Sequence, residues 1–196
     1  ILSRLNTTVK DVTAKFEKFE FGEAGRDLYN FIWNDFCDWY IEMTKEKLTN
    51  GTDEEKDATK NILGYVLDQT LKLIHPIMPF VTEKLWQAMP HDGQSIMVAD
   101  YPVEHVELAN QKAEGEMEDL IELIKAVRNI RNQAGAPMSS PVKMMIKVDD
   151  QAHAAVFNEN RDYLDRFCHP SDLTIATEVD VPKLAMSGIL AGATVY

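Results

Sequence analysis

The hydrophobic residues change their period near residue 140 of this chain, and this change separates two kinds of structure. In residues 1–90, and again from about Ala113, apolar side chains recur with the 3.6-residue period of amphipathic helices. In the segment PVKMMIKV the period becomes two, so that Val142, Met144, Ile146 and Val148 share one face, as in a half-buried strand. The sequence therefore predicts a mainly α fold: an antiparallel helical bundle followed by a small α+β subdomain.

Stop signals and caps predict where the helices of the bundle begin and end. Asn50-Gly51 is a helix stop, and Thr52 and Glu55 have the spacing of a capping box at the next helix start. Pro76 ends that helix, because the residue before a proline is disfavoured in helical conformation. We expect helices over residues 1–19, 23–48, 52–75 and 80–89. Their short connections favour antiparallel neighbours and an up-and-down bundle.

The rest of the chain alternates irregular, helical and extended segments. An irregular linker over residues 90–112 is expected to wrap one edge of the bundle, and a helix from Ala113 ends at Ala134-Gly135-Ala136-Pro137. After the strand at 142–148 we expect a helix at 152–167 and strands at 173–177 and 188–196. The bundle with its linker should thus occupy residues 1–112, and the α+β subdomain residues 113–196. Since the chain opens inside an amphipathic helix without an initiator Met, we expect it to be cut from a longer protein.

Charge and composition restrict the kinds of partner. With 20 basic and 32 acidic residues the net charge is −12, which argues against binding nucleic acid by bulk electrostatics. Any RNA would have to meet a local basic strip on an acidic body. No run approaches the ~20 apolar residues of a membrane span. The two distant cysteines, Cys37 and Cys168, are expected to be buried free thiols.

No pattern of residues points to a self-contained active site. The glycines form no phosphate-binding loop, and no Cys/His cluster has zinc spacing. The five histidines are scattered, and no acid, base or nucleophile is placed beside them by spacing. We therefore expect no catalytic residue, no metal site and no cofactor in this chain.

Residues 31–47, FIWNDFCDWYIEMTKEK, are rich in aromatic side chains. These side chains either pack in the core or form a surface that binds a ligand. At about 100° per residue, one broad side is expected in the core and holds Ile32, Trp33, Phe36, Trp39, Tyr40 and Met43. The opposite side holds Phe31, Asn34, Asp38, Ile41 and Lys45. That second strip can pack on another neighbour, which periodicity alone favours, or present stacking and hydrogen-bonding groups to an unstacked base.

Three arginines stand beside or on buried faces. Arg4 borders the buried side of the first helix, and the apolar stripe of the helix after Ala113 leads into Arg128 and Arg131. Arginines on a core-facing line must be paired or must emerge at an edge, because an unpaired buried charge is very costly. Arg128 and Arg131 either form interdomain salt bridges with acids such as Glu42 or Asp38, or form a phosphate-contacting edge with Lys125, Lys143 and Lys147.

Five segments give the chain a family resemblance: ILSRLN, FIWNDFCDWYIEMTK, HPIMPFVTEKLW, SIMVADYP and AVRNIRNQ, in this order. Together they resemble the C-terminal tRNA-binding part of the bacterial valyl-tRNA synthetases, which are class I aminoacyl-tRNA synthetases. HPIMPFVTEKLW is shared with the isoleucine and leucine relatives, whereas FIWNDFCDWYIE favours valine. The alternatives are the equivalent domain of an isoleucyl- or leucyl-tRNA synthetase, or a helical protein-interaction module without an RNA role, which charge and periodicity alone would favour.

The resemblance implies an anticodon-binding bundle and a small module that precedes a coiled-coil arm. The parent protein would attach valine to tRNA(Val) using ATP, in a catalytic domain whose HIGH and KMSKS signatures this chain lacks. We expect the present portion to be inactive alone and to work with the catalytic and editing domains of the same chain. We also expect a cytoplasmic, monomeric protein with no membrane partner.

The resemblance also implies where tRNA would touch this chain. The Ser-Arg pair of the first helix, here Ser3 and Arg4, would face the anticodon loop. Asn34, Asp38 and Lys45 map near the same loop less closely. Together with the two arginines of the later helix, the candidate tRNA-binding residues are Ser3, Arg4, Asn34, Asp38, Lys45, Arg128 and Arg131.

Overall fold

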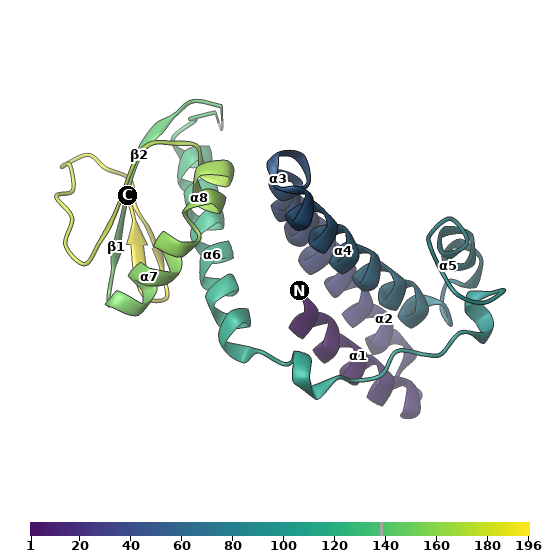
Figure 1. Cartoon of the computed structure of the whole chain (residues 1–196). Helices are drawn as coiled ribbons and strands as arrows, with labels where there is room; N and C mark the ends of the chain where they lie inside the picture. Colours follow the sequence, from purple (N-terminus) through teal and green to yellow (C-terminus); the bar gives the residue numbers. More distant parts are fainter. Residues whose placement is uncertain (138) are drawn as a thin grey trace. The chain divides into compact units, whose positions relative to one another are not determined.

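The computed structural model describes residues 1–137 and 139–196, which form two compact units, Ile1–Gln111 and Lys112–Tyr196. The first unit is built from helices and a linker, and the second combines helices with a small sheet (Figure 1). The predicted fold class, mainly α followed by a small α+β part, is confirmed.

The helices of the first unit are α1 (Leu2–Glu17), α2 (Phe21–Asn30), η1 (Phe31–Ile41), α3 (Glu42–Asn50), α4 (Asp53–Ile74) and α5 (Pro79–Trp86). α2, η1 and α3 follow one another without a break and make one long helical run. α1 packs against α2 and α4, and α3 packs against α4. The core between them includes the buried side chains of Leu5, Val12, Leu28, Val66 and Leu73.

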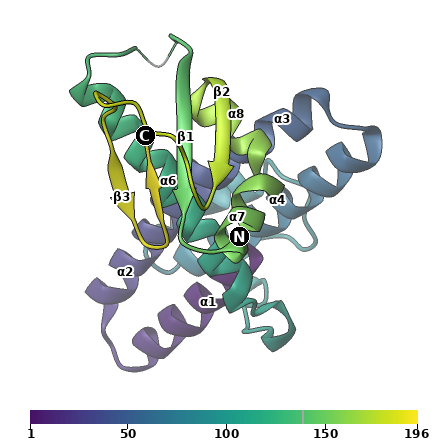
Figure 2. The same cartoon turned by 90° about the vertical axis from the view of Figure 1, so that its left-hand side faces the viewer.

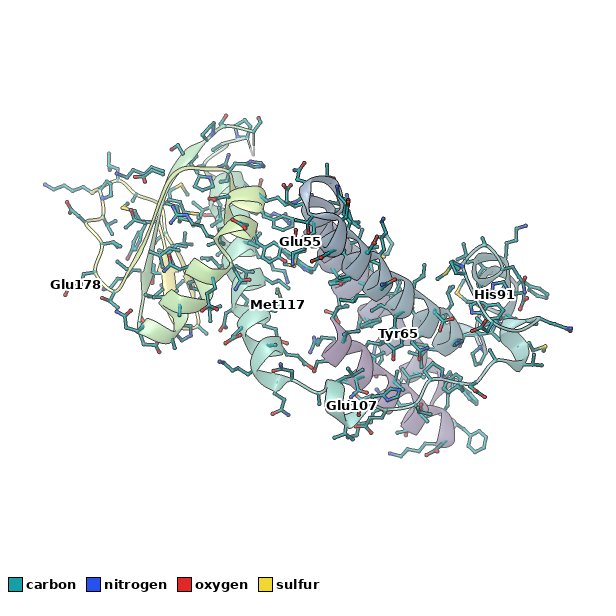
Figure 3. All side chains as sticks on the ribbon, viewed as in Figure 1. Glu55, Tyr65, His91, Glu107, Met117 and Glu178 are labelled. Carbon is teal, nitrogen blue, oxygen red and sulfur yellow. The ribbon has the colours of Figure 1, made fainter. Side chains whose placement is uncertain are left out.

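The predicted helix boundaries around α4 are confirmed. Glu55 donates its main-chain N–H to the Thr52 hydroxyl at 3.2 Å, and its carboxylate accepts from the Thr52 N–H at 2.9 Å. This capping box satisfies two amide donors at the start of α4, where Figure 3 labels Glu55. α4 ends at Ile74, before Pro76, and Pro79 opens α5 at its first position.

The middle of the long run, η1, is a π-helix, which the sequence analysis did not foresee. Its hydrogen bonds join residues five apart, so Phe31, Phe36 and Ile41 share the core-facing side. The prediction made at 100° per residue is therefore wrong for three side chains, one of which is Ile41, expected opposite the core but packed against it. Trp33, expected in the core, is 54% exposed, and Phe31, expected opposite the core, is 2% exposed. Phe36 and Met43 are buried as predicted.

The linker after α5 is irregular apart from two short 3₁₀ turns, η2 (Ile96–Val98) and η3 (Val106–Leu108). Hydrogen bonds fasten it to the bundle. The Tyr101 hydroxyl donates to the Leu73 carbonyl at 3.3 Å, and the His105 N–H donates to the Asn6 side chain at 2.6 Å. These contacts hold the linker along α1 and α4, as predicted.

The second unit begins with α6 (Gln111–Gln133). It continues with β1 (Val142–Val148), α7 (Gln151–Glu159), α8 (Arg161–Cys168), β2 (Pro170–Ala176), β3 (Gly188–Leu190) and β4 (Ala193–Val195). Among its described residues the strands form one sheet in the order β2-β1-β4-β3, with β1 parallel to β2 and antiparallel to β4. Figures 1 and 2 show α6, α7 and α8 on the same face of this sheet.

Two expected elements of the second unit are divided in the structure. The helix expected at 152–167 is broken at Asn160, whose φ of −106° and ψ of 24° leave the helical region, so it becomes α7 and α8. The strand expected at 188–196 is a hairpin of β3 and β4. It turns through Gly192, whose φ of +75° is a conformation that glycine adopts readily.

Candidate nucleic-acid interface

A polar groove of about 370 Å³ lies between α1 and the long helical run of the first unit. α1 contributes Arg4, Thr8, Asp11 and Lys15 to its lining. The opposite wall contains Asp27, Asn30 and Asp35, from α2 and η1. Polar side chains from three elements thus converge at one place on the helical bundle.

Two ion pairs cross this groove and fix its cationic side chains. The Arg4 Nε lies 3.6 Å from a carboxylate oxygen of Asp35, and the Arg4 side chain remains 42% exposed. Further along, the ammonium group of Lys15 donates to the carboxylate of Asp27, and this hydrogen bond raises the pKa of Lys15. Arg4 is therefore paired across the groove while its side chain stays partly exposed.

The charge balance of the groove decides what it can bind. Its lining has two cations, Arg4 and Lys15, against three carboxylates, Asp11, Asp27 and Asp35, so its net charge is 2 − 3 = −1. A phosphate would be repelled, whereas the carboxylates can accept hydrogen bonds from the edge of an unpaired base, and the Asn30 amide can both donate and accept. The groove suits a neutral polar group better than an anion.

Three of the predicted tRNA-binding residues lie on the exposed side of the long run. Asn34 and Asp38 are exposed on η1, and Lys45 is exposed on α3 with an ion pair to Glu42. Asn34 directly precedes Asp35, the partner of Arg4.

Ser3 is placed differently from the expectation. Its side chain is only 9% exposed, and its hydroxyl accepts the N–H of Asn110 at 2.8 Å. It thus anchors the end of the linker to α1. This corrects the expectation that Ser3, like its neighbour Arg4, offers its side chain to a ligand.

Arg131 is also corrected, because it takes neither of the two expected roles. Its side chain is 3% exposed, and its guanidinium donates to the main-chain carbonyls of Cys168 at 3.3 Å, Ser140 at 2.5 Å and Pro137. The expectation that this arginine must be paired was right, but its partners are carbonyls rather than acids or phosphates. Arg131 joins three segments of the second unit.

Arg128 lies on the surface of the second unit. Its guanidinium carbon is 5.6 Å from the centre of the Phe167 ring, and Arg166 approaches the same ring at 5.8 Å. Lys125, one helical turn before Arg128, is exposed as well. Lys143, expected beside them, is 3.6 Å from Asp172 of the adjacent strand. Arg128 and Lys125 therefore form a small basic surface on α6.

Two aromatic side chains beside the groove were not assigned to the surface by the sequence analysis. Tyr29 and Trp33 are 61% and 54% exposed, and their rings are stacked. Asn30, in the wall of the groove, directly follows Tyr29. The periodicity of an α-helix could not reveal the pair, since the π-helix determines the direction in which Trp33 points.

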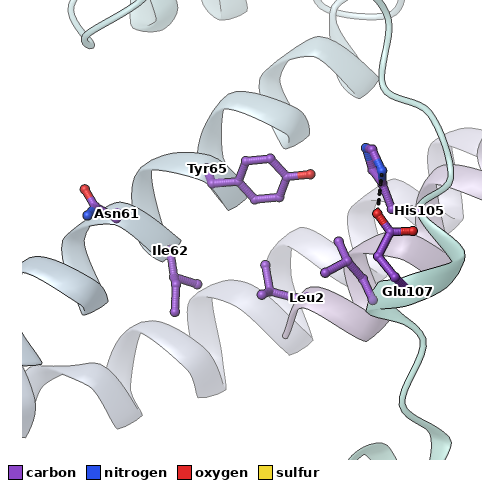
Figure 4. Close-up of a pocket in the computed structure, with 7 residues that line it drawn as sticks. Leu2, Asn61, Ile62, Tyr65, His105 and Glu107 are labelled. Atoms are coloured by element: carbon purple, nitrogen blue, oxygen red, sulfur yellow. Dashed lines mark hydrogen bonds and ion pairs between the residues drawn. The ribbon is translucent and has the colours of Figure 1, made fainter.

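A second hollow of the first unit, about 470 Å³ in volume, is mainly apolar. Leu2, Ile62 and Leu108 line it, from α1, α4 and η3 (Figure 4). At its rim the imidazole Nδ1 of His105 is 3.2 Å from the carboxylate of Glu107, and the ring of Tyr65 extends from α4. Such a hollow accepts an apolar group and offers nothing that would select a phosphate.

Residues 1–137 and 139–196 hold neither a metal-binding cluster nor a helix that could span a membrane. Within these residues, no three His, Cys, Asp or Glu side chains are grouped so that they could hold a metal ion. No helix formed by them is both long and apolar enough to cross a bilayer.

Comparison with known proteins assigns the helical bundle to a protein family. The family described as "Anticodon-binding domain of tRNA ligase" matches residues 1–146, so the chain belongs to this family. The predicted relationship to tRNA ligases is thereby confirmed.

Similar curated proteins define the relationship more narrowly. The chain is 60% identical over 196 residues to the valine–tRNA ligase of Lactiplantibacillus plantarum and 57% identical over 197 residues to that of Latilactobacillus sakei. It is 52% identical over 196 residues to that of Enterococcus faecalis. Each alignment covers 100% of this chain and 22% of the relative, so the chain spans about a fifth of the length of these proteins. These three relatives are ligases for valine, the amino acid that FIWNDFCDWYIE favours.

Proposed function

We propose that this chain is the anticodon-binding part of a valine–tRNA ligase and that it positions tRNA(Val) for a catalytic domain elsewhere in a longer chain. That domain would use ATP to attach valine. The observation that carries the proposal is the 60% identity to a valine–tRNA ligase over the whole chain. The family match over residues 1–146 supports it.

The proposed contacts on the first unit follow from exposure and charge. Lys45 supplies a cation for a phosphate at the edge of the anticodon loop, and Arg4, Asn34 and Asp38 supply hydrogen-bonding groups for unstacked bases. We leave Ser3 out of this set because its hydroxyl is engaged with Asn110.

On the second unit, Arg128 is the proposed phosphate contact, together with Lys125. Arg131 is left out, because its guanidinium is buried among main-chain carbonyls. With so few cations on a body of net charge −12, we expect this portion to bind tRNA weakly at physiological salt.

An exposed apolar patch around α5 supports a further contact with the rest of the ligase. Its side chains are Ile77, Met78, Phe80, Val81 and Leu85, and Phe80 is 90% exposed. We propose that another part of the longer ligase covers this patch. Phe80→Ser should then lower the thermal stability of the full ligase and leave that of the 196-residue chain unchanged; equal effects in both would contradict the contact.

We also propose that the ligase is monomeric and cytoplasmic.

The test of the function is a titration of the 196-residue chain, at low salt, with tRNA(Val) and with the same tRNA carrying an unrelated anticodon. We expect tighter binding of tRNA(Val). Arg4→Ala should weaken that binding roughly tenfold, the cost of a lost hydrogen bond to a charged group. Lys10→Ala, which removes the same charge from α1 and breaks an exposed pair with Glu104, should change it little. Equal affinity for both tRNAs would overturn the proposal.

A further inference from the structure

Tyr29 and Trp33 present two parallel aromatic rings on the outside of the helical bundle. The ring planes differ by 4° and the ring centres are 6.3 Å apart. Both side chains are more than half exposed, at 61% and 54%. Phe31 and Phe36 of the same helical run are buried in the core, and Trp39 and Tyr40 are half-buried, so the run separates the two exposed rings from buried and half-buried ones.

The start of the π-helix accounts for this separation. α2 ends at Asn30 and η1 begins at Phe31. In η1 the core side is taken by residues five apart, Phe31 and Phe36, and Trp33 is left on the outer side, one turn beyond Tyr29. Tryptophan is highly buried on average. Its exposure beside a second ring is a departure that a flat ligand would explain.

The surroundings of the two rings favour a neutral, flat and polar-edged ligand. Asn30 and Asn34 are exposed beside them, and Asn30 also lines the groove that contains Asp35. Amides and carboxylates pair with the donors and acceptors at the edge of a base. The net negative charge of the groove disfavours a phosphate at this place, and the ring faces offer stacking area, which any base can use.

We propose that Tyr29 and Trp33 form a stacking platform for one unpaired base of the tRNA, with the amides of Asn30 and Asn34 placed to bind the edge of that base. This proposal rests on the proposed function and adds to it the site of one base. It differs from the contacts of Arg4 and Lys45, because stacking on a ring involves no charge.

The test replaces unpaired residues of the anticodon loop of tRNA(Val), one at a time, by 2-aminopurine, whose fluorescence falls when the base stacks. The 196-residue chain should quench one loop position strongly. Trp33→Ala should abolish that quenching and weaken tRNA binding roughly 5- to 150-fold, the range for loss of one stacked base. Trp33→Phe should preserve most of the quenching and most of the affinity for tRNA. The dependence of affinity on salt should stay unchanged, because no phosphate contact is lost.

A control variant and a stability measurement separate binding from folding. Tyr65→Ala removes another exposed aromatic ring, on α4 and away from the polar groove, and should leave binding and quenching intact. Trp33→Ala should leave the unfolding midpoint nearly unchanged, since the ring is largely exposed. The platform is overturned if tRNA binds the parent chain while Trp33→Ala alters neither affinity nor quenching, as it would if a protein segment covered the rings. If the unsubstituted 196-residue chain binds no tRNA at all, the proposed function and the platform are overturned together.

Discussion

The buried guanidinium of Arg131 donates to the main-chain carbonyl of Cys168 across 3.3 Å. Arg131 is near the end of α6, and Cys168 is the last residue of α8. The same guanidinium donates to the carbonyls of Pro137 and Ser140, in the segment before β1. One side chain therefore connects the ends of two helices with the entry to the sheet.

Replacing Arg131 by methionine should destabilise the second unit. Arg131→Met keeps much of the apolar stem but leaves buried carbonyls without donors, which costs about 2–4 kcal/mol. Amide hydrogen exchange in β1 should report this as faster exchange. Arg128→Met is the matched control. Arg128 is exposed on the same helix, so the opening free energy that hydrogen exchange reports for β1 should change by less than about 0.5 kcal/mol. Equal effects of the two variants would contradict the structural role of Arg131.

Replacement by alanine should lower stability at Gly192 and raise it at Gly64. Gly192 has φ +75°, and a Cβ there would lie 2.3 Å from the imidazole Nε2 of His153. Gly64 is inside α4, and a Cβ there would meet nothing within 4 Å. Gly192→Ala should destabilise the β3–β4 hairpin by more than about 1 kcal/mol. Gly64→Ala should stabilise the first unit by about 0.5–1 kcal/mol, because alanine favours helix. Urea denaturation of both variants checks the pair: a Gly192→Ala variant that is no less stable than the original chain would contradict the geometry at Gly192, and a destabilised Gly64→Ala variant would contradict the open space at Gly64.

Glu83 should make the stability of the first unit depend on pH. Its carboxylate accepts from the Ser95 hydroxyl at 2.8 Å, the Gln87 amide at 2.8 Å and the Ile96 N–H at 3.1 Å. These hydrogen bonds, chiefly that from Ser95, hold the pKa of Glu83 below its ordinary value of 4.5. A carboxyl group with a lowered pKa contributes stability that is complete above the ordinary value and is lost as pH falls through the folded-state value.

The measurement compares unfolding midpoints of the parent chain and Glu83→Gln between about pH 3 and 7. The parent chain should be the more stable above pH 4.5, and the difference should shrink as the solution is acidified. Glu178→Gln removes the same charge from the exposed loop after β2 and controls for the change in net charge. If the difference in unfolding midpoint between the original chain and Glu83→Gln stays constant across this pH range, the ionised Glu83 carboxylate is not its cause.

Local signals in the sequence predicted much of the fold. The Thr52–Glu55 capping box and Pro79 act through main-chain hydrogen bonds and steric restrictions within a few residues, so they could be recognised without tertiary structure. The strand at Val142–Val148 was equally clear, because its period of two depends only on which face is buried.

The misplaced side chains depend on information that is not local. Nothing in the composition of residues 31–41 distinguishes a π-helix from an α-helix, and this difference exchanged the positions of Phe31 and Trp33. For Arg131 the buried position predicted a partner correctly. The identity of that partner required knowing which chain segments meet at the end of α6.

The two cysteines should differ in reactivity. Burial raises the pKa of the Cys168 thiol to about 12, and it also raises that of the half-buried Cys37. With a pKa of about 12, only about one Cys168 thiol in ten thousand is ionised at pH 8, and the thiolate is the form that reacts. In the folded chain an alkylating reagent should therefore modify Cys37 first and leave Cys168 intact for much longer. Peptide mass spectrometry over a time course measures both rates, and in concentrated urea the two should become similar. Equal rates in the folded chain would show that Cys168 is not enclosed as the structure has it.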